Sequence, residues 1–72
     1  MSIGKAHVLR SINARRIYDY IEEHGPCLPS EIGEAFPDLD RTKRGQVVSN
    51  LREFGLIRKV PYGSVYRWEV IR

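Results

Sequence analysis

The 72-residue sequence predicts an α+β fold in which three helices are followed by a two-stranded β-hairpin. Up to residue 54, apolar side chains recur at spacings of three and four, which is typical of helices with one buried face. Beyond residue 55, β-branched and aromatic residues alternate with charged ones, as in strands with one buried face. With no repeat or low-complexity segment, one domain is predicted over residues 11–72. Residues 1–10 are predicted to form an arm or an extension of the first helix.

The first helix is predicted over residues 11–24, with Ser11 as its N-cap. Gly25 suits the left-handed position after the last turn, and Pro26 cannot continue the helix. An i, i+3, i+4, i+7 pattern indicates the side chains that should form its buried stripe: Ile17, Tyr20, Ile21 and His24.

A short second helix is predicted to begin at Pro29, where proline fits the first turn and Ser30 can cap free N–H groups. Glu31 complements the positive end of the helix dipole, and Pro37 ends the helix. Its apolar face is predicted to consist of Ile32, Ala35 and Phe36.

The third helix is predicted over about residues 40–54, because Asp40 can accept hydrogen bonds from the N–H groups of Thr42 or Lys43. Gly55 is expected to end it. The same helical spacing predicts its buried stripe: Val47, Val48, Leu51 and Phe54.

Two strands are predicted at residues 56–60 and 65–71, since both segments are rich in β-branched and aromatic residues. Residues 61–64 between them contain Pro61 and Gly63, which mark a hairpin turn. The alternation in the second strand predicts the side chains that face the core: Tyr66, Trp68 and Val70.

The formal charge of +3 is unevenly distributed along the chain. Residues 1–40 carry four basic and seven acidic side chains, a net charge of −3, whereas residues 41–72 carry eight basic and two acidic ones, a net charge of +6. Such a separation suggests that one surface meets a polyanion, although small basic proteins also show it by chance.

Three segments in this order resemble the winged helix-turn-helix superfamily: residues 17–26 (IYDYIEEHGP), 28–32 (LPSEI) and 48–57 (VSNLREFGLI). The resemblance covers residues 11–72 and extends to small archaeal and phage-repressor-like regulators; its last segment is the most specific. It implies that the third helix lies in the major groove of double-stranded DNA. The wing, at about residues 58–67, would then contact the backbone or minor groove.

With Leu51 placed at the centre of the buried face, the outward face of the third helix is small and polar over its first two turns. Gln can pair with adenine, Arg with guanine, and Thr or Ser with either. Gly45 costs about 1 kcal/mol relative to alanine within a helix. Either its missing side chain lets the helix sit deep in the groove, or the helix is simply imperfect, or Gly45 packs against the second helix. The residues predicted to read bases are Arg41, Thr42, Gly45, Gln46 and Ser49.

Other polar residues are predicted to contact the DNA backbone. Arg44 projects toward the buried side of its helix, so it is either a phosphate contact or a structural residue. For the cations the alternatives are solvated surface charges and, in the wing, protection of an exposed edge strand. The predicted set is Ser30, Lys43, Arg44, Asn50, Arg52, Arg58, Lys59, Tyr62, Ser64 and Arg67.

The sequence contains no motif that indicates another class of function. His7, His24 and Cys27 lack the spacing of a metal site, and neither a phosphate loop nor a nucleophile triad is recognisable. The sequence therefore predicts no enzyme, no cofactor and no small-molecule ligand. The absence of a long apolar run or a secretory signal, together with a single cysteine, predicts a cytoplasmic protein that does not contact membranes.

The predicted function is sequence-specific binding of double-stranded DNA by a transcriptional regulator. A homodimer is a further hypothesis, since one small module makes few base contacts; residues 1–10 and 70–71 are the candidate interfaces. Two alternatives remain open. One is a winged-helix module that binds other proteins, and the other is a replication or plasmid-maintenance factor that binds DNA.

Overall fold

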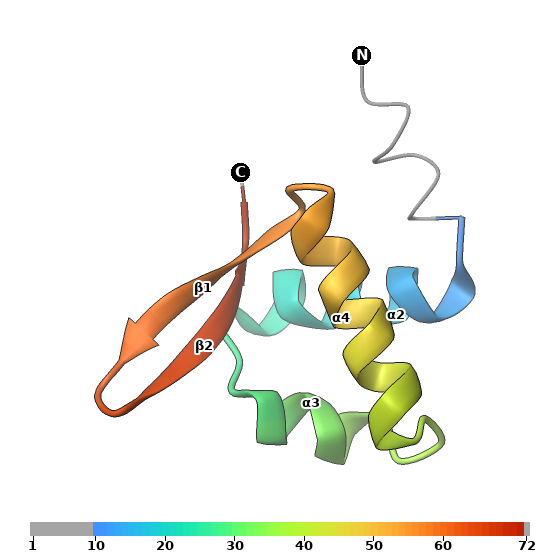
Figure 1. The fold of residues 1–72 in the computed structure, drawn as a ribbon, viewed down its shortest axis with the longest axis horizontal. Helices are drawn as coiled ribbons and strands as arrows, with labels where there is room; N and C mark the ends of the chain where they lie inside the picture. Colours follow the sequence, from blue (N-terminus) through green and yellow to red (C-terminus); the bar gives the residue numbers. More distant parts are fainter. Residues whose placement is uncertain (1–9, 72) are drawn as a thin grey trace.

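The computed structural model describes residues 10–71, so the predictions for residues 1–9, including His7, lie outside the described part. Three helices precede a two-stranded antiparallel sheet, which confirms the α+β prediction and is consistent with a winged-helix layout (Figure 1). The elements are α2 (Ile12–His24), α3 (Pro29–Ala35), α4 (Arg41–Glu53), β1 (Ile57–Tyr62) and β2 (Val65–Val70).

Side-chain caps begin the helices, two of them as predicted. The Ser11 hydroxyl accepts a hydrogen bond from the Ala14 N–H at 3.4 Å, and an Asp40 carboxylate oxygen accepts one from the Lys43 N–H at 2.7 Å. At α3 the prediction for Ser30 is wrong. The Glu31 carboxylate accepts a hydrogen bond from the Leu28 N–H at 2.6 Å, so Glu31, and not Ser30, supplies the side-chain contact at the start of α3.

The core lies where the three helices meet the base of the hairpin. Its centre consists of aliphatic side chains with less than 2% of their surface exposed, contributed by four of the five elements: Ile17, Ile21, Ile32, Leu51 and Ile57. Burial of each contributes about 1.5–3 kcal/mol relative to exposure. Trp68 and Val70 of β2 complete the core, as the alternation predicted, whereas Tyr66 is only half-buried.

Two predicted core residues lie at the surface instead. The His24 side chain is 52% exposed and stacks on the Tyr20 ring, with 4.3 Å between ring centroids. Phe54 is 47% exposed because α4 ends one residue before it and the chain turns at Gly55, where φ is 76°. Leu56 takes the place in the core that helical spacing had assigned to Phe54.

The hairpin turn is tighter than the predicted four-residue connection. Tyr62 pairs with Val65, so only Gly63 and Ser64 lie between the strands, and Pro61 and Tyr62 belong to β1. Gly63 has φ of 62° while no other residue type in the described chain has positive φ, which matches a type II′ turn.

The connection between α2 and α3 joins the outer edge of β2. Cys27 and Trp68 exchange two backbone hydrogen bonds, at 2.8 and 2.9 Å, which form an isolated antiparallel bridge. This bridge fixes the hairpin against the helices. Within residues 10–71, no helix combines the length and apolar character needed to cross a membrane.

Candidate nucleic-acid interface

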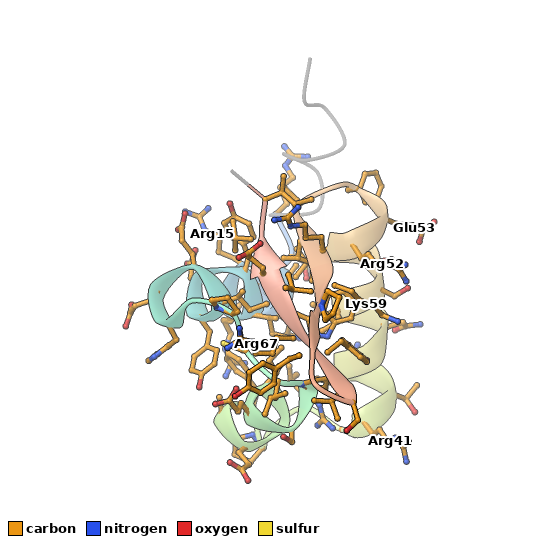
Figure 2. All side chains as sticks on the ribbon, turned by 90° about the vertical axis from the view of Figure 1, so that its left-hand side faces the viewer. Arg15, Arg41, Arg52, Glu53, Lys59 and Arg67 are labelled. Carbon is orange, nitrogen blue, oxygen red and sulfur yellow. The ribbon has the colours of Figure 1, made fainter. Side chains whose placement is uncertain are left out.

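The register of the hairpin sorts its side chains onto two faces, because directly opposed residues of an antiparallel pair point the same way. Lys59 is opposite Trp68, and Tyr66 lies two residues before Trp68, so these three share one face. Arg58 and Arg67 project from the other face. Figure 2 shows Lys59 and Arg67 on opposite sides of the hairpin, with Lys59 on the side of α4.

A groove of about 420 Å³ lies between α4 and the Lys59 face of the hairpin. Its floor is apolar and includes Ile32, Val48 and Trp68. Among the residues that the structure describes, four cationic side chains line it and no acidic side chain does. We call this the cationic groove, and its charged residues are Arg41, Arg44, Arg52 and Lys59.

Three arginines outside the groove are neutralised by nearby acids. Arg15 pairs with Asp19 at 3.4 Å, and Arg16 pairs with Asp38 at 2.8 Å. On the far face of the hairpin, Arg58 donates two hydrogen bonds to one carboxylate oxygen of Glu69, at 2.8 and 3.0 Å. These cations are therefore less available to an external anion than their number suggests.

The cations of α4 lack such partners. Within residues 10–71, Arg41 and Arg52 form no ion pair and no side-chain hydrogen bond, and both side chains are exposed. Figure 2 shows them on the same side of the molecule as Lys59, with Arg15 on the opposite side. A polyanion approaching this side meets uncompensated positive charge.

Lys59 is held over the aromatic residues of the groove. Its ammonium group lies 4.5 Å from the centroid of the Tyr66 ring and 5.9 Å from that of Trp68. The two rings meet edge to face, with 5.4 Å between their centroids. Such cation–π contacts hold a flexible lysine in place without removing its charge.

Gly45 stands in the middle of α4 and lines the cationic groove. A Cβ built at this position would meet no atom within 4 Å. The alternative that Gly45 packs against the second helix is therefore wrong, since open space lies where the side chain would project. No contact inside the described protein explains a glycine here.

The structure brings together only part of each predicted contact set. Of the predicted base-reading residues, Arg41, Gly45 and Ser49 line the cationic groove. Thr42 and Gln46 are exposed on α4 but outside the groove. Of the predicted backbone contacts, Arg44, Arg52 and Lys59 line it. The exposed members of this set outside the groove are Ser30, Lys43, Asn50, Arg58, Tyr62 and Ser64.

The predicted wing contacts Tyr62 and Arg67 form a separate pair on the opposite face of the hairpin. The Arg67 guanidinium carbon lies 4.1 Å from the centroid of the Tyr62 ring, and the Arg67 Nε is buried with no hydrogen-bond partner among residues 10–71. Tyr66 and Pro29 also line the groove, although neither was predicted to contact a ligand. The strand register, once known, identifies Tyr66 as a neighbour of Lys59.

The rejected metal and nucleophile candidates occupy different environments. Cys27 is buried, and its thiol donates to the Gly25 carbonyl at 3.0 Å. Burial raises the pKa of this thiol, which keeps it protonated. His24 is exposed, and within residues 10–71 no three His, Cys, Asp or Glu side chains gather in a manner that could hold a metal ion.

Comparison with known proteins identifies no relative of this chain: no protein-family model, no curated protein and no solved structure matches it. The chemistry of the cationic groove is therefore inferred from its own side chains. They offer positive charge and N–H donors along one face of α4, beside an apolar floor. Such a surface is suited to an extended anionic ligand.

Proposed function

We propose that the protein binds double-stranded DNA with sequence preference and acts as a transcriptional regulator. In this proposal α4 lies in the major groove, and the hairpin contacts the flanking backbone or minor groove. The observation that supports it most directly is the cationic groove itself, where unpaired arginines of α4 and Lys59 of β1 meet without an acidic neighbour. Release of counterions from DNA phosphates would supply most of the binding free energy.

The character of α4 favours DNA over a smaller anion. Its exposed face carries Arg41, Thr42, Gln46 and Ser49, whose side chains offer the donors and acceptors that base edges recognise. A major groove about 12 Å wide admits one helix. Glu53 lies at the opposite end of α4 from Arg41 (Figure 2), so the N-terminal part of the helix is the part suited to close approach.

The test measures binding of the protein to a labelled pool of duplexes with a random central sequence, at several salt concentrations. The logarithm of the binding constant should fall with the logarithm of salt concentration, with a slope of about −0.9 for each phosphate neutralised. The double variant Arg52→Ala/Lys59→Ala, which removes two predicted backbone contacts of the cationic groove, should lose about two units of that slope. Arg15→Ala, on the opposite side of the molecule, is the control and should retain the wild-type slope.

Sequencing of the bound duplexes tests the base-reading part of the proposal. An enriched motif is expected, and Arg41→Ala should relax the preference at one position, at a cost of about 1–3 kcal/mol for the preferred base. Salt-sensitive binding without an enriched motif would reduce the function to non-specific DNA binding. No binding at low salt would contradict the DNA proposal and favour an acidic protein partner for the groove.

A further inference from the structure

Arg44 differs from the other cations of the groove because its guanidinium group is held in place by the protein. One of its terminal nitrogens, Nη1, donates a hydrogen bond to the Leu39 carbonyl at 3.3 Å. On another side the group lies against Gly33 of α3. A Cβ built on Gly33 would lie 3.3 Å from Arg44 Cζ, 3.3 Å from Nη2 and 3.5 Å from Nε. These nearly equal distances mean that a face of the guanidinium plane lies over Gly33.

The remaining donors of Arg44 are unused. Within the described chain, Nε and Nη2 make no hydrogen bond, and neither is completely buried, since Arg67 Nε is the one completely buried side-chain nitrogen without a partner there. Arg44 also lines the cationic groove. Its unused N–H groups are therefore accessible to a ligand in the groove, while Leu39 and Gly33 hold the group in position.

We propose that Arg44 is a fixed phosphate-binding residue of the cationic groove and that Gly33 is the residue that positions it. The Nε–H and Nη2–H groups form the fork that matches two oxygens of a phosphate. Because the side chain is already ordered, it loses less conformational freedom on binding than an exposed arginine does. That the phosphate belongs to DNA rests on the function proposed above.

Gly33 is suited to this role because it has no side chain. A contact of 3.3 Å to a Cβ is too close for an ordinary van der Waals contact, so alanine at position 33 would displace the guanidinium by a few tenths of an ångström. The hydrogen bond to Leu39 is already longer than the usual distance of about 2.9–3.0 Å, so such a shift should weaken it further. Gly33→Ala should therefore release Arg44 while favouring the helix itself.

The first experiment examines the free protein by NMR, following the Nε–Hε signal of Arg44. In the wild type this signal should be resolved from that of Arg52, because the group is fixed over Gly33, and inorganic phosphate should shift it. In Gly33→Ala it should move to the averaged position of a mobile arginine. A wild-type signal already at that position, or one that phosphate leaves unmoved, would overturn the inference without reference to DNA.

The second experiment measures affinity for a duplex in two backgrounds. Gly33→Ala should weaken binding about fivefold in the wild type and less than about twofold in Arg44→Ala, since the glycine acts through the arginine. Equal losses in both backgrounds would show that Gly33 acts elsewhere and would overturn the inference. If the wild type binds no duplex but phosphate still shifts the Arg44 signal, the DNA proposal fails and the phosphate site stands.

Arg44→Lys keeps the test decisive if Gly33→Ala does not fold. Lysine retains the charge but lacks the planar fork, and its ammonium group cannot lie flat against Gly33. The affinity of Arg44→Lys for the duplex should fall about as far as that of Gly33→Ala, and its far-ultraviolet circular dichroism spectrum should be unchanged. Wild-type affinity in Arg44→Lys would show that charge alone is used there, which would overturn the proposed fixed fork.

Discussion

Gly45 lies in the second turn of α4, where a glycine lowers helix stability and fills no structural need. Gly45→Ala should raise the free energy of unfolding by about 0.5–1 kcal/mol, because alanine favours the helix and its Cβ meets only open space. The same methyl group would project into the cationic groove and should weaken binding to a duplex by at least about threefold. Urea unfolding and a DNA titration measure the two effects.

The two measurements on Gly45→Ala separate the functional explanation from the structural one. Greater stability together with weaker binding means that a ligand approaches the backbone of α4 closely at this position. Greater stability with unchanged affinity would mean that the glycine is an accident of the helix. That result would contradict the explanation that Gly45 lets α4 sit deep in a DNA groove.

The ion pair between Asp38 and Arg16 makes the stability of the folded protein depend on pH in the acid range. Arg16 donates two hydrogen bonds to the Asp38 carboxylate, at 2.8 and 3.1 Å, and the resulting hydrogen bonding lowers the pKa of Asp38 below its ordinary value of 3.8. Because the pKa of Asp38 is lower in the folded state than in the unfolded state, the ion pair contributes fully to stability above the pKa of the unfolded state. This contribution is lost as the pH falls through the pKa of the folded state.

Asp38→Asn tests this contribution. The variant should be less stable than the wild type at neutral pH by a small amount, because the pair is exposed to solvent. The difference between the two urea midpoints should persist down to about pH 4 and shrink below it, as the wild-type carboxylate takes up its proton. A difference that stays constant down to pH 2 would exclude the ion pair as its source.

At the scale of the element, α4 depends on its cap more than α2 does. The bond from the Lys43 N–H to Asp40 is 2.7 Å long, against 3.4 Å for the bond from the Ala14 N–H to Ser11. Asp40 also places a negative charge at the positive end of the helix dipole. Asp40→Ala should therefore cost about 1–2 kcal/mol of unfolding free energy and Ser11→Ala about half as much or less.

Two comparisons decide whether the cap explains the effect of Asp40→Ala. Asp40→Asn keeps the acceptor oxygen and should recover most of the lost stability, because asparagine caps about as well as aspartate. Chemical denaturation of the three variants, followed by circular dichroism, gives the values. A loss in Ser11→Ala equal to that in Asp40→Ala would mean that bond length does not measure the strength of these caps.

The residues at which helices begin were predictable from the sequence, because a capping side chain acts on N–H groups close to it in the chain. Asp40 and Ser11 act on N–H groups three residues away, so their effect is encoded in adjacent positions. Element ends were harder to predict. The turn at Gly55 removes Phe54 from the buried stripe and brings Leu56 into the core, an outcome decided by how the chain enters β1.

The candidate site was predictable in composition but not in arrangement. The faces of the hairpin follow from a two-residue turn, and a change of register by one residue would have exchanged Lys59 with Arg58 in the groove. The contact between Arg44 and Gly33 joins two helices, so no local pattern in the sequence indicates it. The helical projection left Arg44 as either a phosphate contact or a structural residue, and its bond to Leu39 shows that it makes a contact within the protein.

At the scale of the molecule, α2 with its acidic residues and α4 with the unpaired arginines lie on two sides of the fold. Figure 1 looks along the shortest dimension of 20 Å, with α4 in front of α2, and Figure 2 shows the same pair side by side. The acids of α2, including Asp19 and Glu23, are exposed. A ligand on the α4 side therefore meets the cationic groove, while the acids of α2 lie across the thickness of the protein.

This separation allows local contacts to be distinguished from net charge. At 0.15 M salt the Debye length is about 8 Å, less than half the 20 Å thickness, so charges on α2 should be screened from a ligand on α4. Asp19→Asn/Glu23→Gln should change affinity for a duplex by less than about twofold, although it raises the net charge by two. Arg41→Ala/Arg52→Ala changes the net charge by the same amount and should cost at least about tenfold. Equal and opposite effects of the two double variants would mean that DNA responds to the total charge of the protein, and the cationic groove would lose its assignment as the binding surface.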